Sequence, residues 1–202
     1  MDVARRRTRL DPQVRRELIL DEAATIVADE GVSAVNMERL GREAGISKAL
    51  VYNYFPSRQA LLSDLLIREY RRFQTEARQA AADADAADLP MLVRVTTRAY
   101  LNHVKERGVL IQRLMNEPAV SAAVRELDSE GRQHTVEYFG SRISSTFGID
   151  RQAAETASDL LMGLTAAAGD YLARTGAEVA KVEDIVLELI LGALTRLGEQ
   201  SR

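Results

Sequence analysis

The chain has 202 residues, of which 46% are hydrophobic, and its formal net charge is −3. This length and hydrophobic fraction suffice for a folded core and exclude an intrinsically disordered chain. The absence of cysteine excludes disulfide bonds, thiolate catalysis and cysteine-ligated metal sites. The sequence has no apolar run of about 18 residues and no apolar stretch behind its N-terminal arginines, so we expect a soluble, cytoplasmic protein without a membrane partner.

Positive charge is concentrated at the N-terminus. Residues 1–20 contain six arginines and three acidic residues, whereas the chain as a whole is acidic. A basic end on an acidic body favours an anionic partner, such as nucleic acid, at that end. A solvated basic tail is the alternative explanation.

Helical periodicity dominates the N-terminal part of the chain. Apolar residues recur at helical spacing between Pro12, which suits the first helical position, and Gly31, which suits a C-cap. Two short helices and a longer one are expected to follow, the first ending at Gly45 and the second before Pro56. The residues expected to cap these four helices are, in chain order, Asp11, Asn36, Ser47 and Ser57.

The second part of the chain is also predicted to be helical. The alanine- and aspartate-rich tract from Gln79 to Asp88 lacks large apolar side chains, so we expect a loop or a frayed helix end there. Beyond it the periodicity and the positions of glycine and proline predict helices at about 89–106, 109–116, 118–147, 151–174 and 182–198. No segment alternates in a way that requires a strand. The sequence therefore predicts an all-α fold of about nine helices.

The second and third predicted helices are joined by a four-residue Ala-Gly-Ile-Ser segment. A glycine lets the chain reverse tightly and Ile46 can fill the space between the helices, which is typical of a helix-turn-helix whose second helix enters the major groove of DNA. The helix N-termini at Asn36 and Ser47 suit DNA phosphates, and Lys48 adds a positive charge in the first turn. These features predict a DNA-binding element.

Aromatic residues gather in the third predicted helix, although the whole chain has only 6 Tyr, 4 Phe and no Trp. We expect Phe55 to pack inward, and the hydroxyl groups of Tyr52 and Tyr54 to reach DNA phosphates. Such contacts would set the register of the protein on DNA. The alternative is that the capping and aromatic residues of this segment only cap and pack.

The segment from Asn36 to Leu62, NMERLGREAGISKALVYNYFPSRQALL, resembles the helix-turn-helix signature of the TetR family of bacterial transcriptional regulators. The matching positions are Asn36, Leu40, Ala44, Gly45, Ile46, Ser47, Lys48, Tyr52, Tyr54, Phe55, Arg58, Leu61 and Leu62. Ala49, Leu50 and Val51 depart from the residues common in the family. Ala49 and Leu50 suit apolar contacts with thymine methyl groups, but the departures leave the base preference undetermined.

The resemblance implies a homodimer whose two third helices enter successive major grooves of a pseudo-palindromic, double-stranded operator. It also implies that the arm ahead of Asp11 touches DNA. The corresponding domains are a helix-turn-helix DNA-binding domain at 1–58 and a helical ligand-binding and dimerisation domain at 59–202. The predicted DNA-binding residues are Asn36, Ser47, Lys48, Ala49, Leu50, Tyr52, Asn53, Tyr54 and Arg58.

The two most apolar predicted helices, at 151–174 and 182–198, carry many small residues that allow close helix packing. They are interpreted as part of the monomer core and, on other faces, as half of a four-helix bundle formed by two protomers, which the resemblance supports. The residues predicted for the dimer interface are Leu160, Leu164, Ala168, Ile185, Leu189 and Leu194.

The middle helices of the second domain place polar and aromatic side chains among aliphatic ones. This pattern suits a mostly apolar cavity for an unknown small molecule of hydrophobic or amphipathic character. Ordinary helix interfaces or solvent-exposed positions are the alternative for each residue. The residues predicted to bind the ligand are Tyr100, His103, Arg113, Met115, His134, Tyr138 and Arg142.

No catalytic motif is present. The sequence lacks a Gly-x-Ser-x-Gly elbow, a P-loop and a His-Glu-x-x-His motif, and its two histidines lack carboxylates at a spacing typical of a metal site. We therefore expect no enzyme activity, no cofactor and no metal. The predicted function is a one-component transcriptional repressor that a small ligand releases from its operator. The alternative is a helical dimeric interaction or ligand-binding protein that keeps this scaffold without operator-specific DNA binding.

Overall fold

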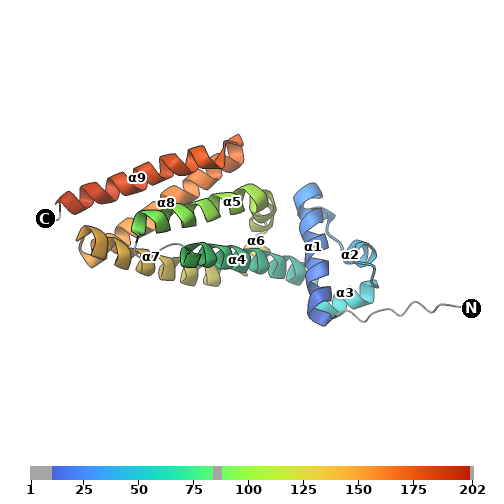
Figure 1. The fold of residues 1–202 in the computed structure, drawn as a ribbon. Helices are drawn as coiled ribbons and strands as arrows, with labels where there is room; N and C mark the ends of the chain where they lie inside the picture. The colour runs from blue at the N-terminus through green and yellow to red at the C-terminus, as the bar shows by residue number, and fades with distance from the viewer. Residues whose placement is uncertain (1–10, 84–87, 201–202) are drawn as a thin grey trace, which may run out of the picture.

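The computed structural model describes residues 11–83 and 88–200, and within these ranges the chain contains nine α-helices and no strand (Figure 1). This confirms the all-α prediction. The N-terminal arginines expected to touch DNA lie outside the described residues. The helices are α1 (Pro12–Glu30), a 3-10 turn η1 (Val32–Ala34), α2 (Met37–Glu43), α3 (Lys48–Tyr54), α4 (Arg58–Asp83), α5 (Leu89–Met115), α6 (Pro118–Ser121), α7 (Arg125–Phe147), α8 (Arg151–Thr175) and α9 (Val179–Gln200).

The predicted starts of the first four helices are confirmed. The side chains of Asp11, Asn36, Ser47 and Ser57 each accept a hydrogen bond from a backbone N–H two or three residues later. These bonds satisfy helix N–H groups that have no partner inside the helix, so they fix where each helix begins. None of the helices in the described ranges is long and apolar enough to cross a membrane.

Two helix boundaries in the second part of the chain were predicted wrongly. The helices expected at 89–106 and 109–116 form one continuous helix, α5, because Leu101, Leu110 and Leu114 keep one face buried through the glycine at 108. The helix expected at 118–147 is divided into α6 and α7, and Val124 beside the break is buried. In the tract expected to be a loop or a frayed helix end, α4 continues as far as Asp83, and residues 84–87 lie outside the described residues.

We call α1, η1, α2 and α3 the head and α4 to α9 the body. The head lies at one end of an elongated molecule, with α1 crossing the end of α4, and α8 and α9 lie on the far side of the body (Figure 1). Two clusters of buried apolar residues form the core. One joins the head to the first turns of α4, the end of α5, α6 and the start of α7, whereas the other lies within the body. The long helices α4 and α5 therefore connect the two ends of the molecule, and the head core continues past the predicted boundary at residue 58.

Candidate nucleic-acid interface

The turn between α2 and α3 depends on two glycines. Gly45 has a backbone φ of +66°, a conformation that L side chains rarely adopt, and it allows the chain to reverse. Gly41, inside α2, brings the two helices into contact: a Cβ atom there would lie 2.9 Å from the carbonyl oxygen of Ile46 and 3.1 Å from the backbone nitrogen of Lys48. The sequence interpretation missed this role of Gly41, although a glycine in the middle of a short helix was the available signal.

The packing of α3 determines which of its residues face solvent. Val51 and Phe55 are fully buried in the head core, so the opposite side of α3 points outward. Tyr52 is 43% exposed, and Asn53 beside it is also exposed. The predicted DNA-binding residues that the structure places in solvent are Asn36, Ser47, Lys48, Ala49, Tyr52 and Asn53. They lie on α3 or at the N-terminal ends of α2 and α3, in the head at one end of the molecule (Figure 1).

Three other predicted DNA-binding residues are only partly exposed to solvent. Arg58 donates hydrogen bonds to the carbonyl oxygens of Val35, at 2.8 Å, and of Val32, so its guanidinium holds the start of α4 against η1. This contact gives Arg58 a structural role in place of the expected one. Tyr54 packs against the head core and is half-buried, and Leu50 is also half-buried.

The basic side chains of α2 and α3 differ in their ion pairs. Arg39 binds Glu30 with both terminal nitrogens, and this hydrogen-bonded pair raises the pKa of Arg39 and lowers the pKa of Glu30. Lys48 Nζ lies 3.6 Å from Glu38 Oε2, and both side chains are largely exposed. Exposed pairs of this kind are weak, so a DNA phosphate can replace Glu38 as the partner of Lys48.

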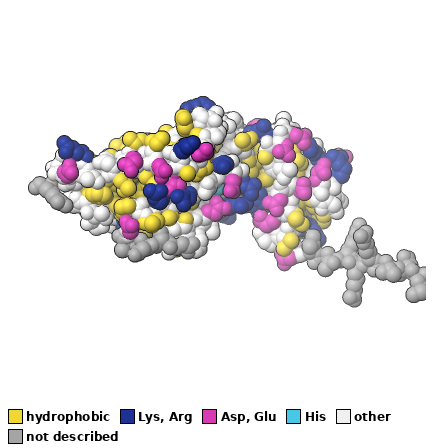
Figure 2. Space-filling model, turned by 45° about the horizontal axis from the view of Figure 1, so that its top comes forward, with side chains coloured by type: hydrophobic (Ala, Val, Ile, Leu, Met, Phe, Trp, Pro, Cys, Tyr) yellow, Lys and Arg dark blue, Asp and Glu magenta, His cyan; other side chains and the backbone are white. Residues whose placement is uncertain are grey.

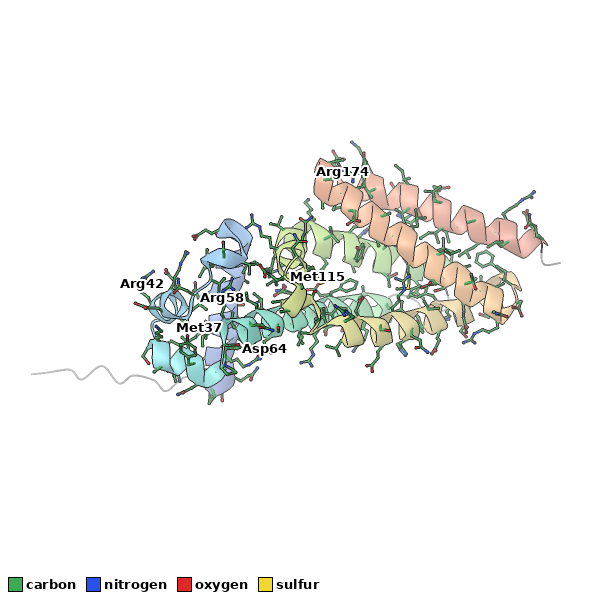
Figure 3. The ribbon with its side chains drawn as sticks, turned by 180° about the vertical axis from the view of Figure 1, so that it is seen from behind. Met37, Arg42, Arg58, Asp64, Met115 and Arg174 are labelled. Carbon is green, nitrogen blue, oxygen red and sulfur yellow. The ribbon has the colours of Figure 1, made fainter. Side chains whose placement is uncertain are left out.

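Arg42 is a basic residue that the sequence interpretation missed. Its side chain is 70% exposed, and it lies on the side of α2 that faces away from the body (Figure 3). Its partner in the structure is Glu43, with 3.6 Å between the charged atoms. Arg42 and Lys48 are therefore the two basic residues of α2 and α3 that solvent reaches most freely.

Two of the predicted ligand-binding residues come together in the body. Tyr100 and His103 of α5 both contact Phe73 of α4, with ring centroids 5.7 and 5.1 Å from it. Gly169 of α8 lies against the Tyr100 ring, where a Cβ atom would be 2.8 Å from a ring carbon. We call Phe73, Tyr100 and His103 the aromatic cluster. It joins α4 and α5, with His103 buried and Phe73 and Tyr100 half-buried.

His103 is 6% exposed, and its Nδ1 lies 3.4 Å from Glu76 Oε2. Burial lowers the pKa of His103, and the nearby carboxylates of Glu76 and Glu69 only partly offset this effect. Burial also raises the pKa of Tyr100. Both rings are therefore neutral at neutral pH, which suits a mostly apolar site.

The other five predicted ligand-binding residues lie elsewhere. Arg113 binds backbone carbonyls of α1, and Met115 is exposed where the end of α5 meets the head (Figure 3). His134 and Tyr138 are exposed on α7, with the Arg142 guanidinium 5.7 Å from the centroid of the Tyr138 ring. The seven residues therefore do not line a single cavity. Within the described ranges, no group of three or more histidine and acidic side chains is placed to hold a metal ion.

The predicted dimer interface is mostly exposed. Leu160, Ile185 and Leu189 are 70%, 63% and 53% exposed, and hydrophobic side chains gather on this part of the body (Figure 2). A groove of about 570 Å³ between α8 and α9 is lined partly by Leu160 and Leu197. Leu164 and Ala168 are half-buried beside it. Leu194, also predicted for the interface, is fully buried in the body core at the edge of this groove.

Residues 19–65 match the model of a family described as bacterial regulatory proteins, tetR family. The transcriptional regulator BetI of Rhizobium meliloti (strain 1021) is 34% identical over 88 residues, and the chain spans only 43% of the length of that relative. The transcriptional repressor KstR of Rhodococcus jostii (strain RHA1) is 26% identical over 192 residues, which cover 92% of this chain and 86% of KstR.

Solved structures show the same fold over nearly the whole chain. A TetR-like transcriptional regulator from Rhodococcus sp. RHA1 has a TM-score of 0.71 at 24% identity, and the match covers 92% of this chain and 98% of the other. The fatty acid degradation regulator FadR from Bacillus halodurans has a TM-score of 0.71 at 14% identity, with 90% and 96% covered. The family match of the head is thus accompanied by a shared fold in the body.

Proposed function

Because this chain belongs to the tetR family of bacterial transcriptional regulators, we propose that it is a repressor that binds an inverted-repeat operator as a homodimer. A small molecule that binds the body releases it from the operator. The observation that carries this proposal is the presentation of α3, which is anchored by buried Val51 and Phe55 and turns an exposed face outward at one end of the molecule. KstR, which aligns with most of the chain, is named a repressor.

The outward face of α3 has the chemistry for a major groove. Ser47 caps the helix, so the N-terminal end of α3 offers N–H groups to a phosphate, and Lys48 adds a positive charge beside it. The Tyr52 hydroxyl can set the register of the helix on the backbone of the DNA. Ala49 offers a small apolar surface to a thymine methyl group, and Asn53 offers an amide to base edges or the backbone.

A homodimer supplies the surface that a single head lacks. One small module buries about 600–1,000 Å² on DNA, which is at the low end for specific binding. The exposed apolar side chains of α8 and α9, above all Leu160, Ile185 and Leu189, can pair across a twofold axis to form a four-helix bundle. The two α3 helices would then meet half-sites about 34–36 Å apart.

The aromatic cluster is the proposed place where a ligand acts. Phe73 belongs to α4, whose first turns place Leu61 and Leu65 in the head core, so a shift of α4 in the body moves the head. Burial keeps the rings of Tyr100 and His103 neutral while Glu76 and Glu69 lie near His103, and this mixture of apolar and polar groups favours a small hydrophobic or amphipathic molecule. The ligand must bind the released conformation better than the DNA-bound one, with a coupling of about 1–3 kcal/mol.

Selection of binding sites from random-sequence duplexes tests the proposal. The purified protein should enrich a palindrome, and Lys48→Ala and Tyr52→Phe should each weaken binding to it about three- to tenfold at fixed salt. Lys105→Ala, which removes an exposed charge from α5, is the matched control and should bind normally. A dimer that enriches no palindrome would instead support the alternative, an interaction or ligand-binding protein on the same scaffold.

A further inference from the structure

The C-terminal end of α1 has no basic residue of its own, although a positive charge there would stabilise the helix. The last carbonyl groups of a helix lack partners inside the helix and carry partial negative charge. The last turn of α1 has no basic residue and contains Asp29 and Glu30, which add negative charge. Arg113 Nη1 donates hydrogen bonds to the carbonyl oxygen of Val27 at 2.6 Å, which also accepts a bond from the Gly31 N–H, and to that of Ala28 at 2.8 Å. A residue of the body therefore caps the main helix of the head.

Arg113 lies on α5, a helix that contributes buried residues to both the head core and the body core. Its neighbours Leu110 and Leu114 are buried in the head core, whereas Leu92 and Leu101 of the same helix are buried in the body core. A continuous helix of this kind behaves as a rod about 40 Å long. Arg113 thus connects the body to the C-terminal end of α1 through a rigid element.

The N-terminal half of α1 is attached to a different helix. Arg16 Nη2 lies 2.8 Å from Asp64 Oδ2, and Arg68 Nη1 lies 2.8 Å from Asp21 Oδ1, so both ion pairs join α1 to α4. The C-terminal half of α1 packs against α5 instead, because Ile26 and Val27 are buried in the head core together with Leu110 and Leu114. Arg113 adds a directional polar contact to this apolar packing, at the other end of α1 from the two ion pairs.

We infer that Arg113 is a positioning residue for operator binding: by capping α1 from α5, it fixes the tilt of the head on the body and with it the separation of the two α3 helices in the dimer. This inference rests on the proposed function, because the separation matters only for a dimer on a two-site operator. The C-terminal end of α1, where Arg113 binds, lies away from α3 (Figure 1), so the proposed effect of Arg113 on α3 passes through α1.

The orientation of the head can be measured without DNA. The chain has no native cysteine, so Thr25→Cys on α1 and Glu137→Cys on α7, both exposed, give two unique sites for spin labels. Labelled protein diluted into an excess of unlabelled protein should report the head-to-body distance in single chains. Arg113→Gln should broaden or shift the distance distribution by several ångströms. Arg196→Gln, which removes an exposed charge paired only locally with Glu199, should leave it unchanged.

The spacing of the half-sites gives the second measurement. On the palindrome selected by the wild type, Arg113→Gln should lose about tenfold in affinity, the equivalent of one charge-assisted hydrogen bond. When one base pair is inserted between the half-sites, Arg113→Gln should lose less affinity than the wild type loses. Its affinity for random-sequence DNA should equal that of the wild type. Arg113→Lys, which keeps the charge, should recover part of the affinity, and equal helix content by circular dichroism should show that both variants fold.

Unchanged label distances together with an unchanged spacing preference in Arg113→Gln would overturn the inference. Failure of the proposed function looks different. In that case the wild type itself selects no palindrome, and Arg113 then has no role in operator binding. The label distances still decide whether Arg113 fixes the orientation of the head on the body.

Discussion

Replacing Gly41 with alanine tests whether close contact between α2 and α3 builds the DNA-binding surface. The new Cβ atom would lie 2.9 Å from the carbonyl oxygen of Ile46, 3.1 Å from the nitrogen of Lys48 and 3.3 Å from the carbonyl carbon of Ser47. All three neighbours are backbone atoms at the start of α3, so no flexible side chain can move aside. The variant must therefore shift α3 away from α2 or unfold the head.

Two opposing effects set the size of the change. Alanine is favoured over glycine in the middle of a helix by about 0.5–1 kcal/mol, whereas inserting a methyl group into a packed contact costs about 1–3 kcal/mol. Contact with three backbone atoms places Gly41→Ala at the upper end of that cost, so we expect a net loss of about 1–2 kcal/mol in the free energy of unfolding. Gly108→Ala in α5 meets only a side-chain carbon of Val104 at 3.4 Å and should be neutral or slightly stabilising.

Urea denaturation followed by circular dichroism gives the stability, and titration with the selected palindrome at fixed salt gives the affinity. Gly41→Ala should be less stable than the wild type and bind the palindrome at least tenfold more weakly, since α3 is displaced. Gly108→Ala should bind like the wild type. A Gly41→Ala variant that is as stable as Gly108→Ala and binds DNA normally would refute the close-contact argument.

Three further changes follow from the described contacts. Glu38→Gln should strengthen DNA binding a few-fold, measured by fluorescence anisotropy, because it frees Lys48 and removes a negative charge near the phosphates. Ile185→Glu should shift the protein from dimer to monomer in analytical ultracentrifugation, whereas Val109→Glu, an equally exposed apolar position on α5, should not. Burial lowers the pKa of His103, so the unfolded state binds more protons than the native state as the pH falls through about 6.5, and native stability falls with it. His103→Leu should flatten this dependence between pH 7.5 and about 5, and an unchanged slope in urea titrations would contradict the assignment.

The parts of the fold set by local chemistry could be predicted from the sequence. The capping side chains of Asp11, Asn36, Ser47 and Ser57 mark helix starts because a short polar side chain can bond nearby N–H groups whatever surrounds it. Phe55 was expected to pack inward because, unlike Tyr52 and Tyr54, it has no hydroxyl group to reach a phosphate, and it is fully buried. Both kinds of signal lie in the residues themselves and their near neighbours in the chain.

Features that depend on distant partners could not be predicted in this way. Gly108 looked like a helix end, but long-range burial of Leu110 and Leu114 in the head core keeps α5 continuous. Arg58 was predicted as a binding residue from its place in the family signature, and Arg113 because an arginine suits an anionic group. Each instead binds backbone carbonyls, 23 to 26 residues away for Arg58 and 85 to 86 for Arg113. The sequence shows the donor but not the carbonyl that it meets.

The positions of these contacts constrain how a ligand could act under the proposed function. The aromatic cluster joins α4, through Phe73, to α5, through Tyr100 and His103, and the same two helices hold α1 at separate points. A movement that carries α4 and α5 together would translate the head without turning it. A molecule inserted between Phe73 and the α5 rings would instead spread the two helices and so rotate α1. Rotation changes the separation of the α3 helices in a dimer, which makes the spacing between α4 and α5 the quantity that a ligand must alter.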